Sequence, residues 1–342
     1  MLPVLGFHAS HEQFPPSELL ALAQQSESLG FRHGMCSDHF SPFSEAQGQS
    51  GFAWSWLGAA LAATNMTWGV VNAPGQRYHP AIVAQAAATL AEMFPGRFWL
   101  ALGSGENINE HITGDRWPPK DERQARLREC VDIIRALFGG ETVTYRGLVR
   151  VEDARLYTLP KTPPLLFAAA VSAETAAWAG EWADGLITVN QPEADLRRVV
   201  EGFRRRGGEA RPIYLQAHVS FAPTLAAARA TAHAEWRSNA LTGSLLWDVR
   251  LPKDLDGAAQ YVRQEDLDSS VRIAANLEEH VAWLLNDSDL GFDRVYLHQV
   301  GRNQSEFLQV FGRDVLPRCS LIEGPASTRY NAAASGIEPT GR

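Results

Sequence analysis

The chain has 342 residues, of which 45% are hydrophobic and 20% charged, a mixture typical of globular proteins and not of disordered or fibrous ones. Its formal net charge is −8, with Lys and Arg scattered, which argues against a duplex nucleic-acid binder because such a protein needs a basic face. Three cysteines are too few for a disulfide framework, and neither a signal-peptide pattern nor an apolar stretch of membrane-spanning length is present. We therefore expect a cytoplasmic protein that does not act at a membrane.

Eight short β-rich runs alternate with helical patterns along almost the whole chain. The runs are Pro3–Phe7, Gly34–Ser37, Thr67–Asn72, Phe98–Gly103, Pro164–Ala168, Gly185–Val189, Ile213–Phe221 and Arg294–Val300. Between them, apolar residues recur with the helical period, and start and stop signals such as Pro80 and Gly30 flank the helices. This alternation predicts parallel strands joined by helical crossovers.

Two architectures satisfy the alternation: a closed (β/α)₈ TIM barrel and an open, doubly wound sheet. Eight units in a chain of this length favour the barrel. An open dinucleotide-binding sheet would show the pattern G-x-G-x-x-G after its first strand, whereas the first run here ends in Phe7-His8-Ala9-Ser10. We therefore predict an α/β fold, with a single TIM barrel carrying insertions over residues 1–320.

Two insertions and a tail are expected in addition to the barrel. Glu141–Tyr157 has the pattern of a β-hairpin that turns at Arg146-Gly147. Leu241–Arg272 is irregular, and the sequence leaves open whether it forms a lid or an extra helix. Small and polar residues dominate the C-terminal end, so we expect residues 321–342 to form a flexible tail.

Polar side chains gather at the predicted carboxyl ends of the strands, which is where TIM barrels carry their functional residues. They are His8, Asp38, His39, Asn72, Ser104, Glu106, Asn109, Asn190, His218 and His298. The histidines do not form a metal motif, because His8 and His11 are three positions apart and would lie on opposite faces of a strand. We predict a site at one rim of the barrel, without a metal ion.

Three positions at this rim have both a functional and a purely structural interpretation. His39 could carry a proton near neutral pH, or it could cap its strand through a backbone hydrogen bond. Glu106 lies in a glycine-flanked loop and could be an acid with a raised pKa, or a solvated loop residue. Ser172 and Thr175 open a helix whose free N–H groups attract anions, although an ordinary Ser N-cap needs no ligand.

Taken together, these residues resemble the luciferase-like flavin enzymes, the bacterial-luciferase superfamily of (β/α)₈ barrels that use FMN or the deazaflavin coenzyme F-420. The resemblance covers about residues 3–318. It is strongest in Gly6-Phe7-His8-Ala9-Ser10, Ser37-Asp38-His39-Phe40, Arg77-Tyr78-His79-Pro80-Ala81, Pro95-Gly96-Arg97-Phe98, Gly103-Ser104-Gly105-Glu106 with Asn109-Glu110, and Ala183-Asp184-Gly185. The most similar members are the deazaflavin-dependent glucose-6-phosphate dehydrogenases and a subfamily of uncharacterised flavin oxidoreductases.

The resemblance implies a role for each of several residues. His39 and Glu106 would be catalytic and flank the reactive flavin carbon, Asp38 would contact the cofactor, and Phe43 occupies the place of a tryptophan that shields the ring. A non-proline cis peptide that supports the flavin would lie at Val70–Val71. The cofactor-binding residues that the resemblance implies are Asp38, Val70, Val71, Ala73, Ser104, Gly105, Asn109, Ala170, Val171, Ser172 and Thr175.

The sugar-phosphate pocket of those dehydrogenases is not matched. Val189-Asn190-Gln191-Pro192 stands where the family has a Thr and a Lys, and Ser270 stands where it has an Arg, with Arg272 nearby. A phosphate dianion would lose charge-assisted hydrogen bonds without those cations, so glucose 6-phosphate is not expected as the substrate. Ala170-Val171-Ser172 replaces a Gly-Gly pair and, with Thr175, resembles the luciferase seat for the FMN phosphate. We therefore expect FMN, with the deazaflavin as the alternative.

Three functions remain open at this point. The leading one is a flavin-dependent oxidoreductase or monooxygenase that uses reduced FMN for hydride transfer or oxygen activation on a small organic substrate. The alternative is a deazaflavin-dependent dehydrogenase of an alcohol or sugar-like substrate. The third is a non-catalytic flavin-binding barrel, against which the retained His39 and Glu106 argue. We also expect the chain to form a homodimer.

Overall fold

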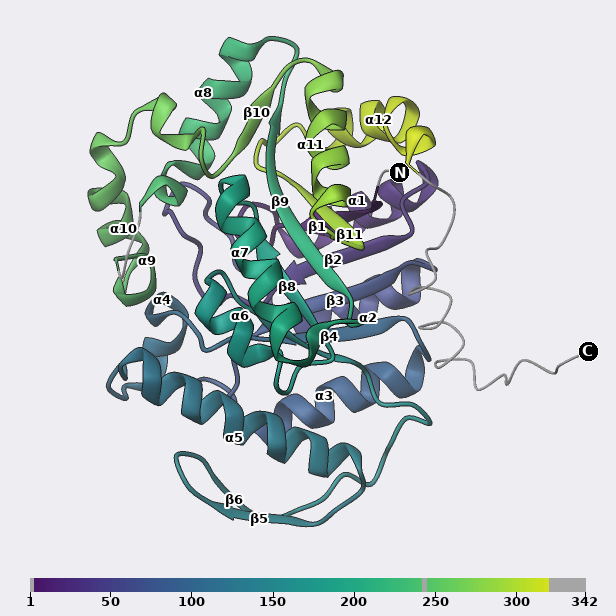
Figure 1. Ribbon diagram of the computed structural model, residues 1–342, viewed down its shortest axis with the longest axis vertical. Helices are drawn as coiled ribbons and strands as arrows, with labels where there is room; N and C mark the ends of the chain where they lie inside the picture. The colour runs from purple at the N-terminus through teal and green to yellow at the C-terminus, as the bar shows by residue number, and fades with distance from the viewer. Residues whose placement is uncertain (1–2, 242–244, 320–342) are drawn as a thin grey trace, which may run out of the picture.

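A closed barrel of eight parallel strands forms the centre of the molecule (Figure 1). The computed structural model describes residues 3–241 and 245–319, and the predicted tail at 321–342 lies outside them. Around the ring, the strands are β1 (Val4–Ala9), β2 (His33–Ser37), β3 (Thr67–Asn72), β4 (Phe98–Leu102), β7 (Leu166–Ala169), β8 (Gly185–Val189), β9 (Ile213–Phe221) and β11 (Arg294–Gln299). The ring is closed because β8 pairs with β9 and β11 pairs with β1.

The predicted TIM barrel is confirmed, and each of the eight expected strands is present within two residues of its expected limits. The strands are buried on both faces, and buried parallel strands produce the continuous apolar runs that the sequence shows. One strand of the sheet was not predicted: β10 (Arg272–Ala274) pairs with the carboxyl end of β9, outside the ring. Three residues are too few to show a periodic pattern.

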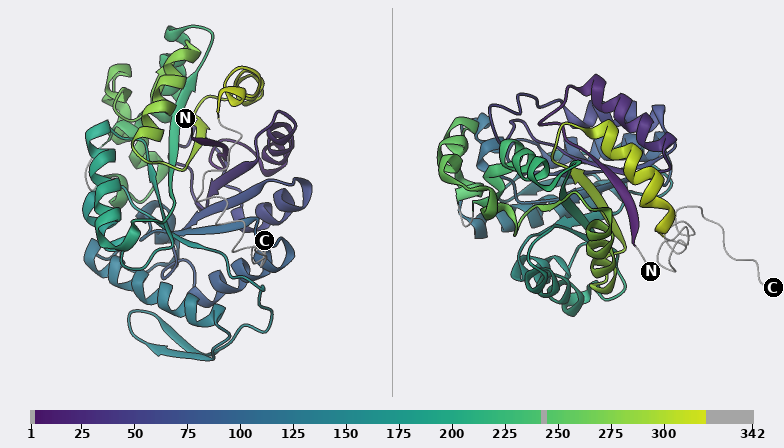
Figure 2. Two further views of the ribbon diagram at one scale, coloured as in Figure 1. Left: turned by 45° about the vertical axis from the view of Figure 1, so that its right-hand side comes forward. Right: turned by 90° about the horizontal axis from the view of Figure 1, so that it is seen from above.

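Helices surround the barrel and connect its strands. They are α1 (Pro16–Ser28), α2 (Ala53–Ala63), α3 (Pro80–Met93), α4 (Asn107–Glu110), η1 (His111–Thr113), α5 (Lys120–Phe138), α6 (Ala173–Ala179), α7 (Glu193–Phe203), η2 (Arg204–Gly208), α8 (Leu225–Trp236), η3 (Arg237–Ala240), α11 (Leu277–Asp289), α12 (Gln304–Asp314) and η6 (Leu316–Arg318). The purple α1 and the yellow-green α12 lie side by side in the right-hand view of Figure 2, so the last helix of the barrel packs on the first. Among the described residues, no helix combines the length and the apolar character needed to cross a bilayer.

Both predicted insertions contain regular structure. The hairpin is confirmed as β5 (Val143–Arg146) paired antiparallel with β6 (Arg150–Ala154), and it lies outside α5 at the bottom of Figure 1. The irregular insertion contains α9 (Leu245–Asp248), α10 (Pro252–Ala258), η4 (Ala259–Tyr261) and η5 (Gln264–Leu267). In Figure 1, α9 stands beside α4, at the rim where β4 ends.

Large aromatic rings fill the interior of the barrel. Trp99, Phe167, Tyr214 and Tyr296 belong to one buried cluster, and their ring centroids lie 4.6–5.7 Å apart. Neighbouring strands make room for these rings with glycine: a Cβ at Gly69 would overlap the indole of Trp99. The interior is therefore packed solid below the rim, as in other TIM barrels, and any site must lie at the mouth.

Candidate active site

His39 and Glu106 meet at the carboxyl ends of the strands. His39 follows β2 and Glu106 is the N-cap of α4, just after β4. The Nε2 atom of His39 lies 3.9 Å from Oε2 of Glu106, and both side chains are partly exposed, by 18% and 22%. The predicted catalytic pair therefore lies close together at the barrel mouth. Phe43 approaches the imidazole of His39 edge-on, with the ring centroids 5.0 Å apart.

Asn109 holds both loops that carry this pair. Its Nδ2 donates to Oε2 of Glu106 at 3.2 Å, and its Oδ1 accepts from the backbone N–H groups of Phe40 and Ser41. These contacts engage both Oδ1 and Nδ2 of the Asn109 side chain, which is buried. Asn109 thus orients Glu106 and the loop after His39, and the cofactor contact that we expected from the sequence stays a prediction.

Surrounding groups raise the pKa of both catalytic candidates. Burial raises the pKa of Glu106 above that of an ordinary glutamate, and the nearby His39 acts in the opposite direction. Burial alone would lower the pKa of His39, but the hydrogen bond and charge of Glu12 raise it. The Nδ1 of His39 lies 2.5 Å from Oε1 of Glu12, a buried residue in the loop after β1 that our sequence analysis gave no role. Both His39 and Glu106 therefore hold a proton more strongly than the same side chains do in water.

Asp38 lies deeper than His39 and presents a free acceptor. Its Oδ2 accepts from Asn72 Nδ2 at 2.8 Å and lies 3.6 Å from Nη2 of Arg77. Within the described parts of the chain, Oδ1 of Asp38 and Oδ1 of Asn72 are buried and have no hydrogen-bond partner. A flavin or deazaflavin carries an N–H donor on its pyrimidine ring, so two unpaired acceptors at the mouth fit that edge of such a ring.

Among the predicted cofactor contacts on β3, only one side chain faces the barrel interior. Val71 packs on the interior aromatic cluster, whereas the side chain of Val70 is buried between the sheet and the helices and does not reach the mouth. The expected cis peptide at Val70–Val71 is wrong, because no peptide bond in the described residues is cis. Both residues pair with β2 and β4, and the trans form is the cheaper one by about 2.5–4 kcal/mol for a non-proline bond. After the strand, Ala73 lies beside Gly105, whose φ of +84° suits glycine.

The predicted anion seat has the expected local geometry. Ser172 is the N-cap of α6: its Oγ accepts from the N–H of Thr175 at 3.3 Å and lies 3.0 Å from Thr175 Oγ1. Gln124 of α5 donates to Thr175 Oγ1 at 3.3 Å. Val171 is half-buried and its carbonyl accepts from Gln191, whereas the side chain of Ala170 is buried in the core. Ser104 is half-buried in the loop opposite, between β4 and Glu106.

Arg123 is a further candidate that our sequence analysis missed. Its guanidinium stacks on Trp117, with Cζ 4.2 Å from the ring centroid, and it is close enough to Glu106 and Asp248 to feel their charges. The residue is 7% exposed, and Nε and Nη1 are buried without a partner among the described residues. A buried cation with unpaired donors close to Glu106 is suited to an anionic group of a ligand bound at the mouth.

A layer of imidazoles lies below the catalytic pair. His8, His218 and His298 come from neighbouring strands, and His298 lies opposite His218 in the ladder. The rings of His8 and His298 stack with centroids 4.1 Å apart, and Trp236 covers His298 edge-on at 4.6 Å. Among the described residues, no group of three or more His, Cys, Asp or Glu side chains is arranged to hold a metal ion.

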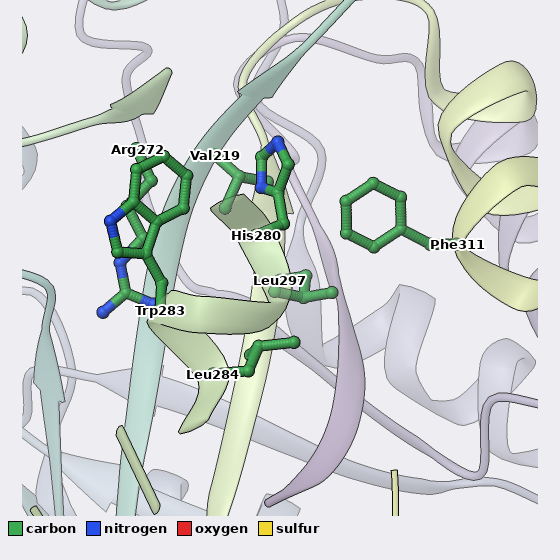
Figure 3. Close-up of a pocket in the computed structure, with 7 residues that line it drawn as sticks. All are labelled: Val219, Arg272, His280, Trp283, Leu284, Leu297 and Phe311. Atoms are coloured by element: carbon green, nitrogen blue, oxygen red, sulfur yellow. The ribbon is translucent and has the colours of Figure 1, made fainter. Parts of the chain in front are cut away.

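A hollow on the outside of the barrel offers no comparable chemistry (Figure 3). It lies between α11, α12 and the outer face of the barrel, where His280 stands between Trp283 and Phe311. Its cation, Arg272, already makes two hydrogen bonds to Asp287, at 2.6 and 2.7 Å. We therefore interpret this hollow as a gap in the packing between helices and sheet.

Comparison with known proteins identifies the family of the chain. The family model for luciferase-like monooxygenases matches residues 2–294. The chain belongs to this family. The resemblance drawn from the sequence motifs is therefore confirmed, and so is the expectation that the protein is an oxidoreductase.

Individual members of the family are similar over nearly the whole chain. An F420-dependent glucose-6-phosphate dehydrogenase from Microbacterium testaceum is 33% identical, over 92% of this chain and 96% of the relative, and one from Intrasporangium calvum is 35% identical over 92% and 98%. Among solved structures, an F420-dependent secondary alcohol dehydrogenase in complex with an F420–acetone adduct superposes with a TM-score of 0.86, at 28% identity, over 94% of this chain and all of that one. These relatives do not support the expectation of FMN as the first choice; they support the deazaflavin alternative.

Proposed function

We propose that the protein is a dehydrogenase that moves a hydride between the carbinol carbon of a small, uncharged alcohol and the deazaflavin coenzyme F420. The observation that carries the proposal is the approach of His39 Nε2 to Glu106 Oε2 at the barrel mouth, with the free acceptor of Asp38 beside them. The relatives are named as F420-dependent dehydrogenases of a sugar phosphate and of secondary alcohols. The name of the family, by contrast, refers to monooxygenases.

The residues at the mouth fit a tricyclic cofactor. Asp38 and Asn72 would accept from the N–H of its pyrimidine edge. Ser172, Thr175 and Arg123 would hold a phosphate. Because α6 has seven residues, its dipole is small, and the side chains of the seat supply most of the attraction.

The chemistry then divides between cofactor and protein. The bound coenzyme supplies the carbon that takes up or releases hydride. His39 receives the hydroxyl proton of the alcohol at Nε2, or returns it to the carbonyl oxygen in the reverse direction. Glu106 holds a second proton beside it, because burial raises the pKa of its carboxyl group. Phe43 and Trp236 reduce the access of water to the pair.

The substrate that the mouth fits is not a phosphate ester. The residues that follow β8 include no lysine; of these, Asn190 donates to Ser270 O and Gln191 donates to Val171 O. Arg272, the cation near the expected phosphate site, is bound by Asp287. A phosphate dianion would remain without a charged partner there, which favours an uncharged alcohol.

An FMN-dependent oxidoreductase is the second candidate, and one observation favours it. The hydroxyl pair Ser172 and Thr175 resembles the seat that luciferase-type enzymes provide for the FMN phosphate. A barrel without turnover is the third candidate. It leaves unexplained why the surroundings raise the pKa of both His39 and Glu106.

The test is a direct comparison of the two cofactors. The purified protein is titrated with F420 and, separately, with FMN, and each loaded form is mixed with 2-propanol, D-glucose and glucose 6-phosphate. We expect tight binding of F420 and loss of its oxidised absorbance with an uncharged alcohol. Binding of FMN alone would replace the first candidate by the second, and binding without reduction by any substrate would favour the third. The expected homodimer is a separate proposal, checked by sedimentation.

A further inference from the structure

A buried carboxylate outside the predicted site contacts the catalytic histidine. Glu12 lies in the loop between β1 and α1, and 2% of its surface is exposed. Its Oε1 lies 2.5 Å from Nδ1 of His39, and its Oε2 accepts from Ser10 Oγ at 2.8 Å. Each oxygen of the carboxylate therefore has one partner, and one of these partners is the imidazole at the mouth.

His39 supplies the Nδ1–H that stabilises the charge of this carboxylate. Among the described residues, no other basic side chain lies within ion-pair distance of Glu12. The nearby imidazoles of His8 and His218 do not replace His39, because burial lowers the pKa of His8 to about 3 and that of His218 to about 4, so both are neutral at pH 7. Burial alone would raise the pKa of Glu12, but the hydrogen bond from His39 brings it down to about 2. An ionised carboxylate at this depth needs the N–H on Nδ1.

The contact decides which nitrogen of His39 is available for chemistry. A carboxylate that accepts from Nδ1–H fixes the tautomer and the orientation of the ring, and the second nitrogen is then the one that exchanges protons. In this structure the second nitrogen is Nε2, which points toward Glu106 at 3.9 Å. Rotation of the ring would break a hydrogen bond to a buried charge.

We propose that Glu12 is a positioning residue: its carboxylate, held by Ser10, keeps the proton of His39 on Nδ1 and directs Nε2 to the substrate side of the mouth. The role in turnover rests on the proposed function, whereas the tautomer and the orientation of His39 do not. The charged and titratable side chains that face His39 are Glu12 and His11 from the loop after β1, His8 from β1, Arg77 from the loop after β3, Glu106 at the start of α4, and His298 from β11.

The first experiment does not depend on turnover. The imidazole ¹⁵N and ¹H resonances of His39 are recorded in the cofactor-free protein as a function of pH and assigned with His39→Gln. We expect the wild type to show Nδ1–H and a pKa above that of an ordinary histidine, and Glu12→Gln to lower this pKa and to mix the two tautomers. An unchanged tautomer and pKa in Glu12→Gln would overturn the proposal.

The second experiment measures the loaded enzyme. In Glu12→Gln, we expect kcat to fall by about 10²–10⁴-fold with little change in KM, as when the orienting carboxylate of a histidine is neutralised. The limb of the pH profile that reports His39 should move to lower pH. Glu12→Asp should recover part of kcat, and Ser10→Ala should show a smaller loss of the same kind. A variant with only a lower melting temperature and an unchanged pH profile would give Glu12 a structural role alone and reject the proposal.

Controls separate this inference from the proposed function. Glu27→Gln removes a carboxylate in the last turn of α1 that accepts from the N–H of Asn65, at the opposite end of the barrel from the mouth, and it should leave both readouts unchanged. If Glu12→Gln does not fold, Ser10→Ala and Glu12→Asp decide the question through the same resonances of His39. If the wild type is inactive with both cofactors, the proposed function fails, and the resonances of His39 still confirm or reject the positioning role.

Discussion

The Nε2 atom of His39 and the Oε2 atom of Glu106 lie 3.9 Å apart, and each belongs to a group that keeps its proton to a higher pH than usual. The causes differ. Burial raises the pKa of Glu106, whereas the buried Glu12 raises the pKa of His39 against the effect of burial. Two neighbouring acids tuned by separate means can give or take a proton in either direction of an alcohol–carbonyl reaction.

Removing either acid should abolish most turnover without releasing the cofactor. We expect His39→Ala and Glu106→Gln each to lower kcat by about 10²–10⁴-fold, the range for one positioned proton-transfer group. Steady-state kinetics and a cofactor titration measure the two effects. Glu45→Gln, at an exposed loop position, serves as the control. Retention of near-normal kcat in both variants would remove the pair from the mechanism.

The anion seat should contribute to cofactor affinity through its side chains. Ser172→Ala combined with Thr175→Ala should weaken binding by about 1–3 kcal/mol, the cost of losing hydrogen bonds to a charged group. Arg123→Leu should have an effect at least as large, whereas Arg128→Leu, on the exposed face of the same helix, should have none. A phosphate-free flavin or deazaflavin is the check, because its affinity should be equal in all four proteins. If the variants lose as much affinity for the phosphate-free ligand as for the phosphorylated one, these side chains do not hold the phosphate.

The sequence predicts the barrel well because its strands are apolar along their whole length and its helices have clear ends. Thr67–Asn72, Gly185–Val189 and Ile213–Phe221 are observed with the limits that were expected. The sequence also predicts that His39 and Glu106 lie close together, because the carboxyl ends of parallel strands share one rim, and the structure agrees. Alternation along β3 could have shown that only one of Val70 and Val71 faces inward.

The residues that the sequence analysis missed depend on contacts between distant segments. Glu12 has no local pattern: its role appears only when the loop after β1 is placed against the loop after β2. Arg123 did leave a signal, because it occupies the buried stripe that continues through Leu127, Cys130 and Ile134, where a cation is unexpected. The choice between FMN and the deazaflavin rests on small differences in one seat, and therefore needed the relatives.

Packing inside the barrel can be tested at a single glycine. Gly69→Ala places a methyl group inside the indole of Trp99, which is itself enclosed by Phe167 and Tyr214. We expect the free energy of unfolding to fall by about 1–3 kcal/mol, as for an overpacked core. Gly257→Ala is the matched control, because nothing lies within 4 Å of its added Cβ. Denaturant unfolding of both variants gives the comparison, and equal stabilities would contradict the packing argument.

The buried histidines should make the fold sensitive to acid. Burial lowers the pKa of His8 to about 3, and those of His218 and His280 to about 4, from 6.5. A histidine with a lowered folded-state pKa binds fewer protons than the unfolded chain, so its contribution to stability is present above pH 6.5 and is lost as the pH falls toward the folded-state pKa. At pH 5, each such histidine lowers the free energy of unfolding by on the order of 2 kcal/mol. His39 acts in the opposite sense, because its pKa is raised.

His280 allows this effect to be isolated, because it lies on α11, outside the ring of strands, and packs against Phe221 and Phe311 (Figure 3). Replacing it by Phe removes one titrating group from the folded protein. We expect the loss of unfolding free energy between pH 7 and pH 5 to be smaller in His280→Phe than in the wild type, by about 2 kcal/mol. Phe311→Leu changes the same packing without changing a proton site, so it should lower stability equally at both pH values. Parallel pH profiles for wild type and His280→Phe would show that His280 is already protonated, or already exposed, in the folded protein.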